Sequence, residues 1–198
     1  SFENDCVVRE RIDVVFPVLH GENGEDGSVQ GLLQIAGLPY VGSHVAASAA
    51  CMDKTITKLI ADYTGVRQAA WQLVAKAAFA RNPDAVMNET EQKFSYPVFV
   101  KPAGTGSSVG VSKARDRQEL EQALRHLLAY GNHVVVEKKI HGREIQIAVL
   151  GDKYLPAVEI IPQGEFFDYV SKYQAGGAKE ICPAPITDDA VSYTHLTL

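Results

Sequence analysis

The sequence predicts an α/β protein whose central unit is α+β. Near the N-terminus, the apolar run at 12–19 predicts a buried strand, the apolar spacing after Ser28 predicts a helix, and residues 40–42 predict a second strand. Strand, loop, helix and strand in this order are typical of one parallel α/β unit. Further along, the stretch 97–113 holds two predicted strands that only a short loop separates, which indicates an antiparallel pair and a change of architecture.

The central unit, from about residue 67 to residue 137, is predicted from apolar periodicity and capping residues. Before it, a helix begins at Asp53, and Gly65 is its predicted cap. Asp116 followed by Glu119 is a capping pattern for a second helix, which ends at Gly131. The other predicted elements are strands at 71–74 and 133–137, a polar surface stretch at 82–93, and an antiparallel hairpin of 144–150 with 154–161.

Composition and charge exclude several classes of protein. The 198 residues are 46% apolar, which is enough for one or two globular domains. No apolar run approaches the roughly 18 residues of a membrane span, and a net charge of −5 argues against a nucleic-acid-binding surface. The three cysteines are widely spaced and odd in number, so neither a disulfide framework nor a zinc site is predicted. We expect a cytoplasmic protein with small-molecule partners, and neither nucleic acid nor membrane as a partner.

The two ends of the sequence break the patterns next to them. The chain starts without an initiator methionine and soon enters a predicted strand, while the final segment, VSYTHLTL, continues no helix or strand pattern. We therefore expect a fragment of a longer protein. We read 191–198 as a non-native tail and exclude it from the fold prediction.

The stretch 97–113, PVFVKPAGTGSSVGVSK, suggests a phosphate site. Its lysine, Lys101, precedes the glycine-rich loop, whereas in a Walker A motif the lysine follows the loop and a helix comes next. The spacing of Gly104, Gly106 and Gly110 does not match a dinucleotide fingerprint either. A loop rich in backbone N–H groups and hydroxyls can close over an anion. A hairpin without any ligand has the same composition, so this stretch alone leaves both interpretations open.

The order of the polar residues after this loop suits a nucleotide between two sheets. Glu137 ends the predicted strand V-V-V-E, and Glu144 follows in the stretch H-G-R-E. In such a site the loop would cover the phosphates and Lys101 would neutralise them. Carboxylates at strand ends can accept hydrogen bonds from the adenine amino group and from ribose hydroxyls.

Taken together, these motifs resemble the D-alanine–D-alanine ligase family of the ATP-grasp enzymes. The matching stretches occur in the family's order and cover nearly everything from Val14 to Pro185. They are LHGENGEDGSVQGLLQIAGLPYVGS, ACMDK, VFVKPAGTGSSVGVSK, VVVEKKIHGREIQIAVLG, and FFDYVSKY followed by ICPAP. The resemblance implies a partial ATP-grasp fold with a remnant of an N-terminal parallel α/β domain.

The same resemblance divides the chain into four segments. Residues 1–57 would be the remnant of the N-terminal substrate domain, and 58–141 the central ATP-grasp subdomain with the phosphate-covering loop. Residues 142–190 would begin the C-terminal subdomain, which carries a mobile loop, and 191–198 is the non-native tail.

The family's chemistry implies ATP-dependent ligation of two D-alanine molecules for peptidoglycan precursor synthesis. ATP phosphorylates the first D-alanine, the amine of the second attacks the acyl phosphate, and phosphate leaves. The resemblance also implies Mg2+ or Mn2+ as a cofactor and a homodimer. The family's metal ligands follow the position of Pro185, and Asp188 and Asp189 do not match their motif, so we assign no metal ligand and expect the chain as given to be inactive.

Each expected site residue is carried over from a matching motif. The resemblance assigns phosphate contacts to Lys54 and Lys101 and a substrate and loop contact to Ser107. It places the first D-alanine near His20, with Glu25 orienting its neighbours. His20, Ser107 and Tyr173 would take part in catalysis, with Tyr173 closing toward Ser107. The remaining expected ATP-binding residues are Ser108, Glu137 (adenine), Lys138, Ile140, Glu144 (ribose) and Lys172 (phosphate).

Several alternatives remain. A tyrosine at position 173 favours an amino acid over D-lactate as the second substrate, because relatives that make D-alanine–D-lactate carry a histidine in this loop. A D-alanine–D-serine ligase therefore stays open. The chain would also suit a non-catalytic ATP-binding remnant, since it keeps the expected ATP contacts without the metal site. Another ATP-grasp ligase is disfavoured by the H-G-x-x-G-E-D-G loop.

Overall fold

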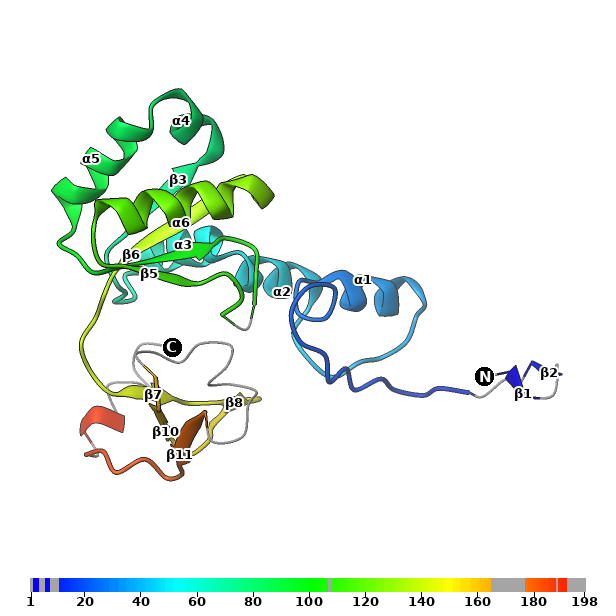
Figure 1. Ribbon diagram of the computed structural model, residues 1–198. Coiled ribbons are helices and arrows are strands. Elements are labelled where there is room, and N and C mark those ends of the chain that lie inside the picture. The colour runs from blue at the N-terminus through cyan, green and yellow to red at the C-terminus, as the bar shows by residue number, and fades with distance from the viewer. Residues whose placement is uncertain are drawn as a thin grey trace.

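The computed structural model describes residues 2–3, 6–7, 11–106, 108–164, 177–187 and 189–191. Figure 1 shows α1 and α2 in the N-terminal part, then a central sheet with helices along it, and a smaller sheet that contains β7, β10 and β11. The N-terminal part contains β1 (Phe2–Glu3), β2 (Cys6–Val7), α1 (Ser28–Ile35) and α2 (Val45–Met52). The central part contains α3 (Lys54–Thr64), β3 (Trp71–Ala75), α4 (Lys76–Arg81), α5 (Pro83–Lys93), β4 (Val98–Pro102), β5 (Ser112–Ala114), α6 (Arg117–Tyr130) and β6 (His133–Lys138). The last part contains β7 (Glu144–Gln146), β8 (Val149–Leu150), β9 (Lys153–Tyr154), β10 (Val158–Pro162) and β11 (Ala178–Ile181).

The central sheet has the strand order β3-β6-β4-β5, and every neighbouring pair is antiparallel. This confirms the predicted α+β unit. Residues in a strand alternate between the two faces of the sheet. Val134 and Val136 of β6 therefore share one face, while Val135 and Glu137 share the other.

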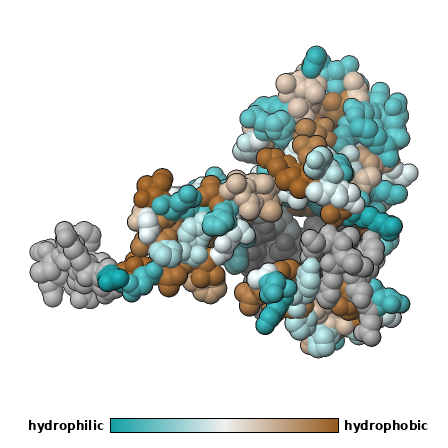
Figure 2. Space-filling view, turned by 180° about the vertical axis from the view of Figure 1, so that it is seen from behind, coloured by the Kyte–Doolittle hydropathy of each residue, from teal (hydrophilic) through white to brown (hydrophobic). Residues whose placement is uncertain are grey.

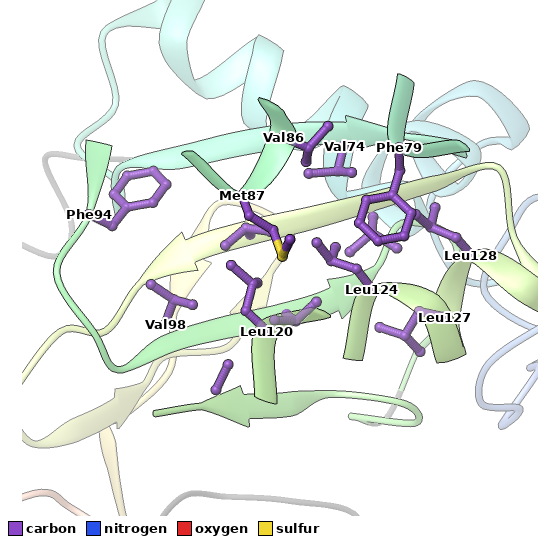
Figure 3. Close-up of a cluster of buried hydrophobic side chains, with 14 residues drawn as sticks. Val74, Phe79, Val86, Met87, Phe94, Val98, Leu120, Leu124, Leu127 and Leu128 are labelled. Atoms are coloured by element: carbon purple, nitrogen blue, oxygen red, sulfur yellow. The ribbon is translucent and has the colours of Figure 1, made fainter. Parts of the chain in front are cut away.

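One face of this sheet packs against α4, α5 and α6 and forms the core (Figure 3). Leu120 and Leu124 of α6 are fully buried there. A buried polar contact crosses the same layer, since the Thr90 hydroxyl donates to Gln72 Oε1 at 2.9 Å. The cluster consists of Val74, Phe79, Val86, Met87, Phe94, Val98, Val100, Ala114, Leu120, Leu124, Leu127, Leu128, Val134 and Val136.

The predicted caps of the two long helices are confirmed. Asp53 accepts hydrogen bonds from the backbone of Thr55 at 2.7 Å and Ile56 at 3.2 Å, and Gly65 ends α3 with φ 73°. Asp116 accepts from the backbone of Glu119 at 2.9 Å, and its side chain opens α6. Such caps satisfy backbone groups that the helix itself leaves unpaired.

The prediction of a buried strand at 12–19 was wrong. Only Val15 makes a β-bridge, a parallel one to Tyr40, and Phe16 and Val18 are 71% and 73% exposed. A strand needs a neighbour along its length, and in the described part of the chain only Val15 of this run bonds to one, through Pro39 and Val41. The predicted strand at 40–42 is reduced to the same bridge. Figure 2 shows hydrophobic side chains on the surface of this part of the chain.

Three helices, α2, α4 and α5, were missed by the sequence analysis. The stretch 82–93, predicted as polar surface, is mainly α5, which is capped by Asn82 and starts with Pro83. It buries Val86, Met87 and Thr90, an apolar face too narrow to show in a mostly polar sequence. Helices α2 and α4 were not predicted.

The predictions around the glycine-rich loop and the hairpin hold with shifted bounds. The strand after the loop is β5, later in the chain than the predicted residues 109–112. The hairpin of 144–161 is present as β7 paired with β10 and β8 paired with β9, both antiparallel. Arg143 holds this smaller sheet through a bidentate pair with Glu159, at 2.6 Å from each carboxylate oxygen. Within the described ranges, no helix is both long and apolar enough to cross a membrane.

Candidate functional site

A buried carboxylate between two lysines marks the face of the central sheet opposite the core. Glu137 at the end of β6 accepts from Lys101 of β4, with 2.5 Å between Nζ and Oε2. Its other oxygen, Oε1, lies 3.0 Å from Nζ of Lys58 on α3. Strand register explains the first contact, because Phe99 lies opposite Glu137 and Lys101 is two residues further along the same face.

The two lysines decide the charge of Glu137. Its side chain is only 10% exposed, and burial alone would raise the pKa of the carboxyl group. The ammonium groups of Lys101 and Lys58 outweigh burial, so the net effect is a lowered pKa. Glu137 is therefore a carboxylate at neutral pH.

Helix α3 brings another lysine to the glycine-rich loop. Its first residue, Lys54, donates from Nζ to the carbonyl oxygen of Thr105. The backbone N–H of Lys54 also donates to the carbonyl of Ala103 at 2.9 Å. Lys58 lies four residues after Lys54, so both side chains leave the same face of the helix. The start of α3 is thus fastened to the loop, and its lysines flank both the loop and Glu137.

The loop itself is held by short-range hydrogen bonds. The Thr105 hydroxyl donates to the Val109 carbonyl at 3.0 Å, and the Val109 N–H donates to Gly106 at the same distance. Ser108 has φ 59°, in the left-handed region, and its carbonyl accepts from Val111. These bonds shape a tight turn, and the ammonium group of Lys54 donates to it at Thr105. The expected substrate contact Ser107 lies outside the described residues.

A second polar loop, GENGEDG, faces the first. Glu25 Oε2 accepts from the backbone N–H of Gly21 at 2.6 Å, which closes a turn. Asp26 accepts from the N–H groups of Asn23 and Ser28, and these bonds lower the pKa of Asp26. Gly27 has φ 94°, and a Cβ there would lie 2.8 Å from the carbonyl oxygen of Val45. Only glycine suits this position.

The two loops border one cleft of about 550 Å³. Gly106 of the glycine-rich loop approaches Gly21 and the Glu25 carboxylate, since a Cβ there would lie 3.4 Å from Gly21 Cα and 3.6 Å from Glu25 Oε2. Lys54 and Glu25 both line the cleft. The lining mixes apolar and polar side chains, and its two charged residues, Lys54 and Glu25, suit a small zwitterionic molecule. The cleft is lined by Pro17, Leu19, Gly24, Glu25, Gln30, Val41, Gly42, Ser43, Ala47, Ser48, Cys51, Met52, Lys54, Thr105 and Gly106.

The expected site residues fall into three groups. Ser108 lies in the glycine-rich loop, Lys54 contacts it, and Glu25 faces it across the cleft. Lys101 lies in β4, which leads into the loop, and pairs with Glu137 of β6. His20, Lys138, Ile140 and Glu144 are exposed residues around this region. Lys172 and Tyr173, like Ser107, lie outside the described residues.

Lys58 was missed by the sequence analysis. Its signal was available, because Lys54 and Lys58 stand at i and i+4 in a helix that was predicted correctly. The described residues contain no group of three or more His, Cys, Asp or Glu side chains that could hold a metal ion.

The chain matches both halves of one family. A sequence model of the D-ala D-ala ligase C-terminus matches residues 60–195, and a model of the D-ala D-ala ligase N-terminus matches residues 3–43. The D-alanine–D-alanine ligase of Acetivibrio thermocellus is 48% identical over 185 residues, which are 92% of this chain and 49% of that protein. The Bacillus velezensis enzyme is 47% identical over 181 residues, 90% of this chain and 51% of that protein.

Solved structures agree with these matches. The VanG D-Ala:D-Ser ligase from Enterococcus faecalis has a TM-score of 0.77 at 36% identity, over 95% of this chain and 55% of that one. The D-alanine–D-alanine ligase from Bacillus anthracis has a TM-score of 0.76 at 33% identity, over 95% of this chain and 59% of that one. The chain spans about half the length of the curated relatives it matches. It belongs to the D-alanine–D-alanine ligase family.

Proposed function

We propose that this protein serves the ATP-dependent ligation of two D-alanine molecules to D-alanyl-D-alanine, through an acyl phosphate, for peptidoglycan precursor synthesis. One observation carries the proposal beyond family membership. Lys54 of α3 donates to the glycine-rich loop, and Lys101 lies in β4, the strand that leads into this loop, where it shares the Glu137 carboxylate with Lys58. The ammonium groups of Lys54 and Lys101 therefore offer positive charge to the phosphates of a nucleotide under this loop.

In this proposal the lysines and the loop bind ATP, which supplies the phosphoryl group that activates the first carboxylate. Lys101 and Lys54 contact phosphate oxygens through charge-assisted hydrogen bonds. The N–H groups of the glycine-rich loop complete an anion-binding turn. Adenine and ribose lie toward the end of β6, near Glu137, Lys138, Ile140 and Glu144. Ser108 and Lys172 are further proposed ATP contacts from their motifs.

The substrate roles rest on the second loop and on motifs. His20 and Glu25 would position the first D-alanine in the cleft that Lys54 also lines. A closed site that holds both reactants in line supplies most of the rate, since an acyl phosphate is already reactive. Ser107 and Tyr173 are proposed as catalytic residues that close this site, on motif grounds alone.

Other properties are proposed from the family. They are a divalent metal, Mg2+ or Mn2+, a homodimer, a cytoplasmic location, and the division of the chain at residues 57, 141 and 190.

D-Serine is a second candidate for the attacking substrate. The observation that favours it is the similarity to the VanG D-Ala:D-Ser ligase, with the TM-score of 0.77. Nothing in the described cleft separates two substrates that differ by one hydroxyl group.

The test is phosphate release from ATP that depends on the amino acid, measured on the chain with its native flanking sequence restored. D-Alanine, D-serine, D-lactate and L-alanine are compared, and the 198-residue chain is assayed beside it. Release with D-alanine is the expected result. Turnover with D-serine alone would identify D-serine, and not D-alanine, as the attacking substrate. ATP binding without any turnover would favour a non-catalytic ATP-binding protein.

A further inference from the structure

Lys58 occupies a place that the proposed function leaves unexplained. Its side chain is 13% exposed, against 26% for Lys101, so it is the more deeply buried of the two lysines on Glu137. Its ammonium group also lies 3.5 Å from the carbonyl oxygen of Ala69. Lys58 is thus fixed within the unit, whereas Lys101 stands next to the glycine-rich loop.

The segment after α3 reinforces this position. The Gln68 side chain donates to the carbonyl of Lys58 at 2.8 Å and to Asp62 at 2.5 Å. The indole N–H of Trp71 donates to the other oxygen of Asp62 at 2.9 Å. Trp71 lies directly opposite Glu137 in the β3–β6 register. The helix that carries Lys58 is therefore tied to the strand pair that carries Glu137.

Lys101 pairs with Glu137 in the structure, yet the proposed function, on which this inference rests, requires Lys101 to contact a phosphate. If Lys101 contacts a phosphate, its ammonium group has to turn at least partly away from Glu137. A buried carboxylate that loses its only partner is strongly destabilised. Glu137 has two partners, and the second is a lysine that faces the inside of the unit.

We propose that Lys58 is a positioning residue for nucleotide binding: it keeps the buried Glu137 carboxylate paired, so that Lys101 can turn to a phosphate. Without Lys58, Lys101 becomes the sole counterion of Glu137 and is held back from the nucleotide. The effect of Lys58 therefore depends on the negative charge at position 137 and on the phosphates of the ligand.

A double-mutant cycle on the 198-residue chain tests both dependences. The variants are Lys58→Met, Glu137→Gln and the two together, with ATP and adenosine as ligands. The chain has one tryptophan, Trp71, so its fluorescence reports binding at this strand pair. Lys93→Met is the matched control, because Lys93 forms an exposed pair with Glu89 on α5.

We expect Lys58→Met to weaken ATP binding at least about tenfold, since it affects a buried charge pair. In the Glu137→Gln background the same change is expected to cost less than about twofold, because no charge remains to be compensated. Adenosine binding is expected to change little in either background. Lys58→Arg is expected to retain binding, because a guanidinium group can also pair with the carboxylate.

Three results would overturn the inference. They are an equal loss of ATP affinity in both backgrounds, an equal loss for ATP and adenosine, or a Lys58→Met chain that binds ATP as well as Lys93→Met. If the unmutated chain binds no ATP, the proposed function fails for this chain. Urea unfolding then tests whether Lys58 pairs with Glu137. A midpoint lowered by Lys58→Met only when Glu137 is present supports the pairing, and the same shift in both backgrounds refutes it.

Discussion

Replacing Leu124 by alanine tests whether α6 holds together the unit that carries the lysines. Leu124 lies in the middle of α6, has no solvent-exposed surface, and packs in the core among the residues of Figure 3. Its removal leaves a cavity between α6 and the central sheet. The lysines lie on the opposite face of that sheet, so the substitution separates the stability of the unit from the chemistry of the site.

The expected cost follows from burial. A leucine with 0% of its surface exposed belongs to the class for which truncation to alanine costs about 2.7–5 kcal/mol. Neighbours of Leu124 are themselves packed against strands, so collapse into the cavity is limited and the upper half of that range is expected. Leu32→Ala is the matched control, because Leu32 is 65% exposed on α1 and should cost below about 1 kcal/mol.

Urea unfolding followed by the fluorescence of Trp71 measures this difference, since Trp71 lies in β3 of the same sheet. The affinity for ATP, measured well below the unfolding midpoint, should stay within about twofold of the unmutated chain. A loss below about 1 kcal/mol for Leu124→Ala would show that α6 is not packed as described. An equal loss of unfolding free energy for Leu32→Ala would show that Leu124 is no more buried in a core than the exposed Leu32.

Three further predictions concern the site and its loops. Lys101→Met should weaken ATP binding about ten- to hundredfold, which is the value of a hydrogen bond to a charged group. Lys93→Met should leave the affinity unchanged, and calorimetric titration measures both variants. Equal affinities for the two variants would show that Lys101 does not contact ATP. Gly27→Ala should lower the urea midpoint, because φ at Gly27 is 94° and the new Cβ would lie 2.8 Å from the Val45 carbonyl oxygen. Gly31→Ala in α1, where a Cβ has space, should raise the midpoint slightly. A Gly27→Ala chain with an unchanged midpoint would contradict the strained turn. The pKa of Glu137 is lowered in the folded chain, so its pairing stabilises the fold above the unfolded value near 4.5 and this contribution is lost as the pH falls through the lower folded pKa. Glu137→Gln should therefore flatten the acid limb of a stability-against-pH curve, and an unchanged limb would contradict the pairing.

The parts of the fold that could be predicted are those with local signals. Helix α6 has a capping aspartate, a glutamate three residues later and leucines at helical spacing, and each of these acts within its own helix. Its position and extent followed from these residues alone. The glycine-rich loop between two strands was recognisable for the same reason, since lysine, glycines and hydroxyls are adjacent in the sequence.

The wrong predictions depended on distant partners. The run at 12–19 has the composition of a buried strand, but a strand exists only where a neighbour supplies its hydrogen bonds. Within the described residues Pro39 and Val41, on either side of Tyr40, bond to Val15 alone in this run. Composition also misled at 82–93, where three buried side chains, Val86, Met87 and Thr90, suffice to seat α5 on the sheet. Local signals for a helix were present in this stretch, with Asn82 as the cap and Pro83 at the first helical position. They should have been given more weight than the polar composition.

The candidate site divides in the same way. Lys54 and Lys101 were expected from motifs as phosphate contacts, which stays a prediction. In the structure Lys54 donates to the glycine-rich loop, and Lys101 lies in the strand that leads into it. Lys58 and Lys101 both contact the Glu137 carboxylate. This contact could not be predicted from the sequence, because it joins α3, β4 and β6, which are far apart in the chain. Register decides it: the strand pairs place Trp71 and Phe99 on either side of Glu137, and Lys101 follows Phe99 on the same face.

The residue proposed to contact adenine, Glu137, pairs with Lys101, which is proposed to contact a phosphate. Both side chains lie on the same face of the central sheet, opposite the core. A glutamate in that place can restrain Lys101 as well as accept a hydrogen bond, and its two oxygens are already engaged by ammonium groups. Nucleotide binding then requires an exchange of partners at Glu137, and the depth at which Lys58 is buried makes it the partner that stays.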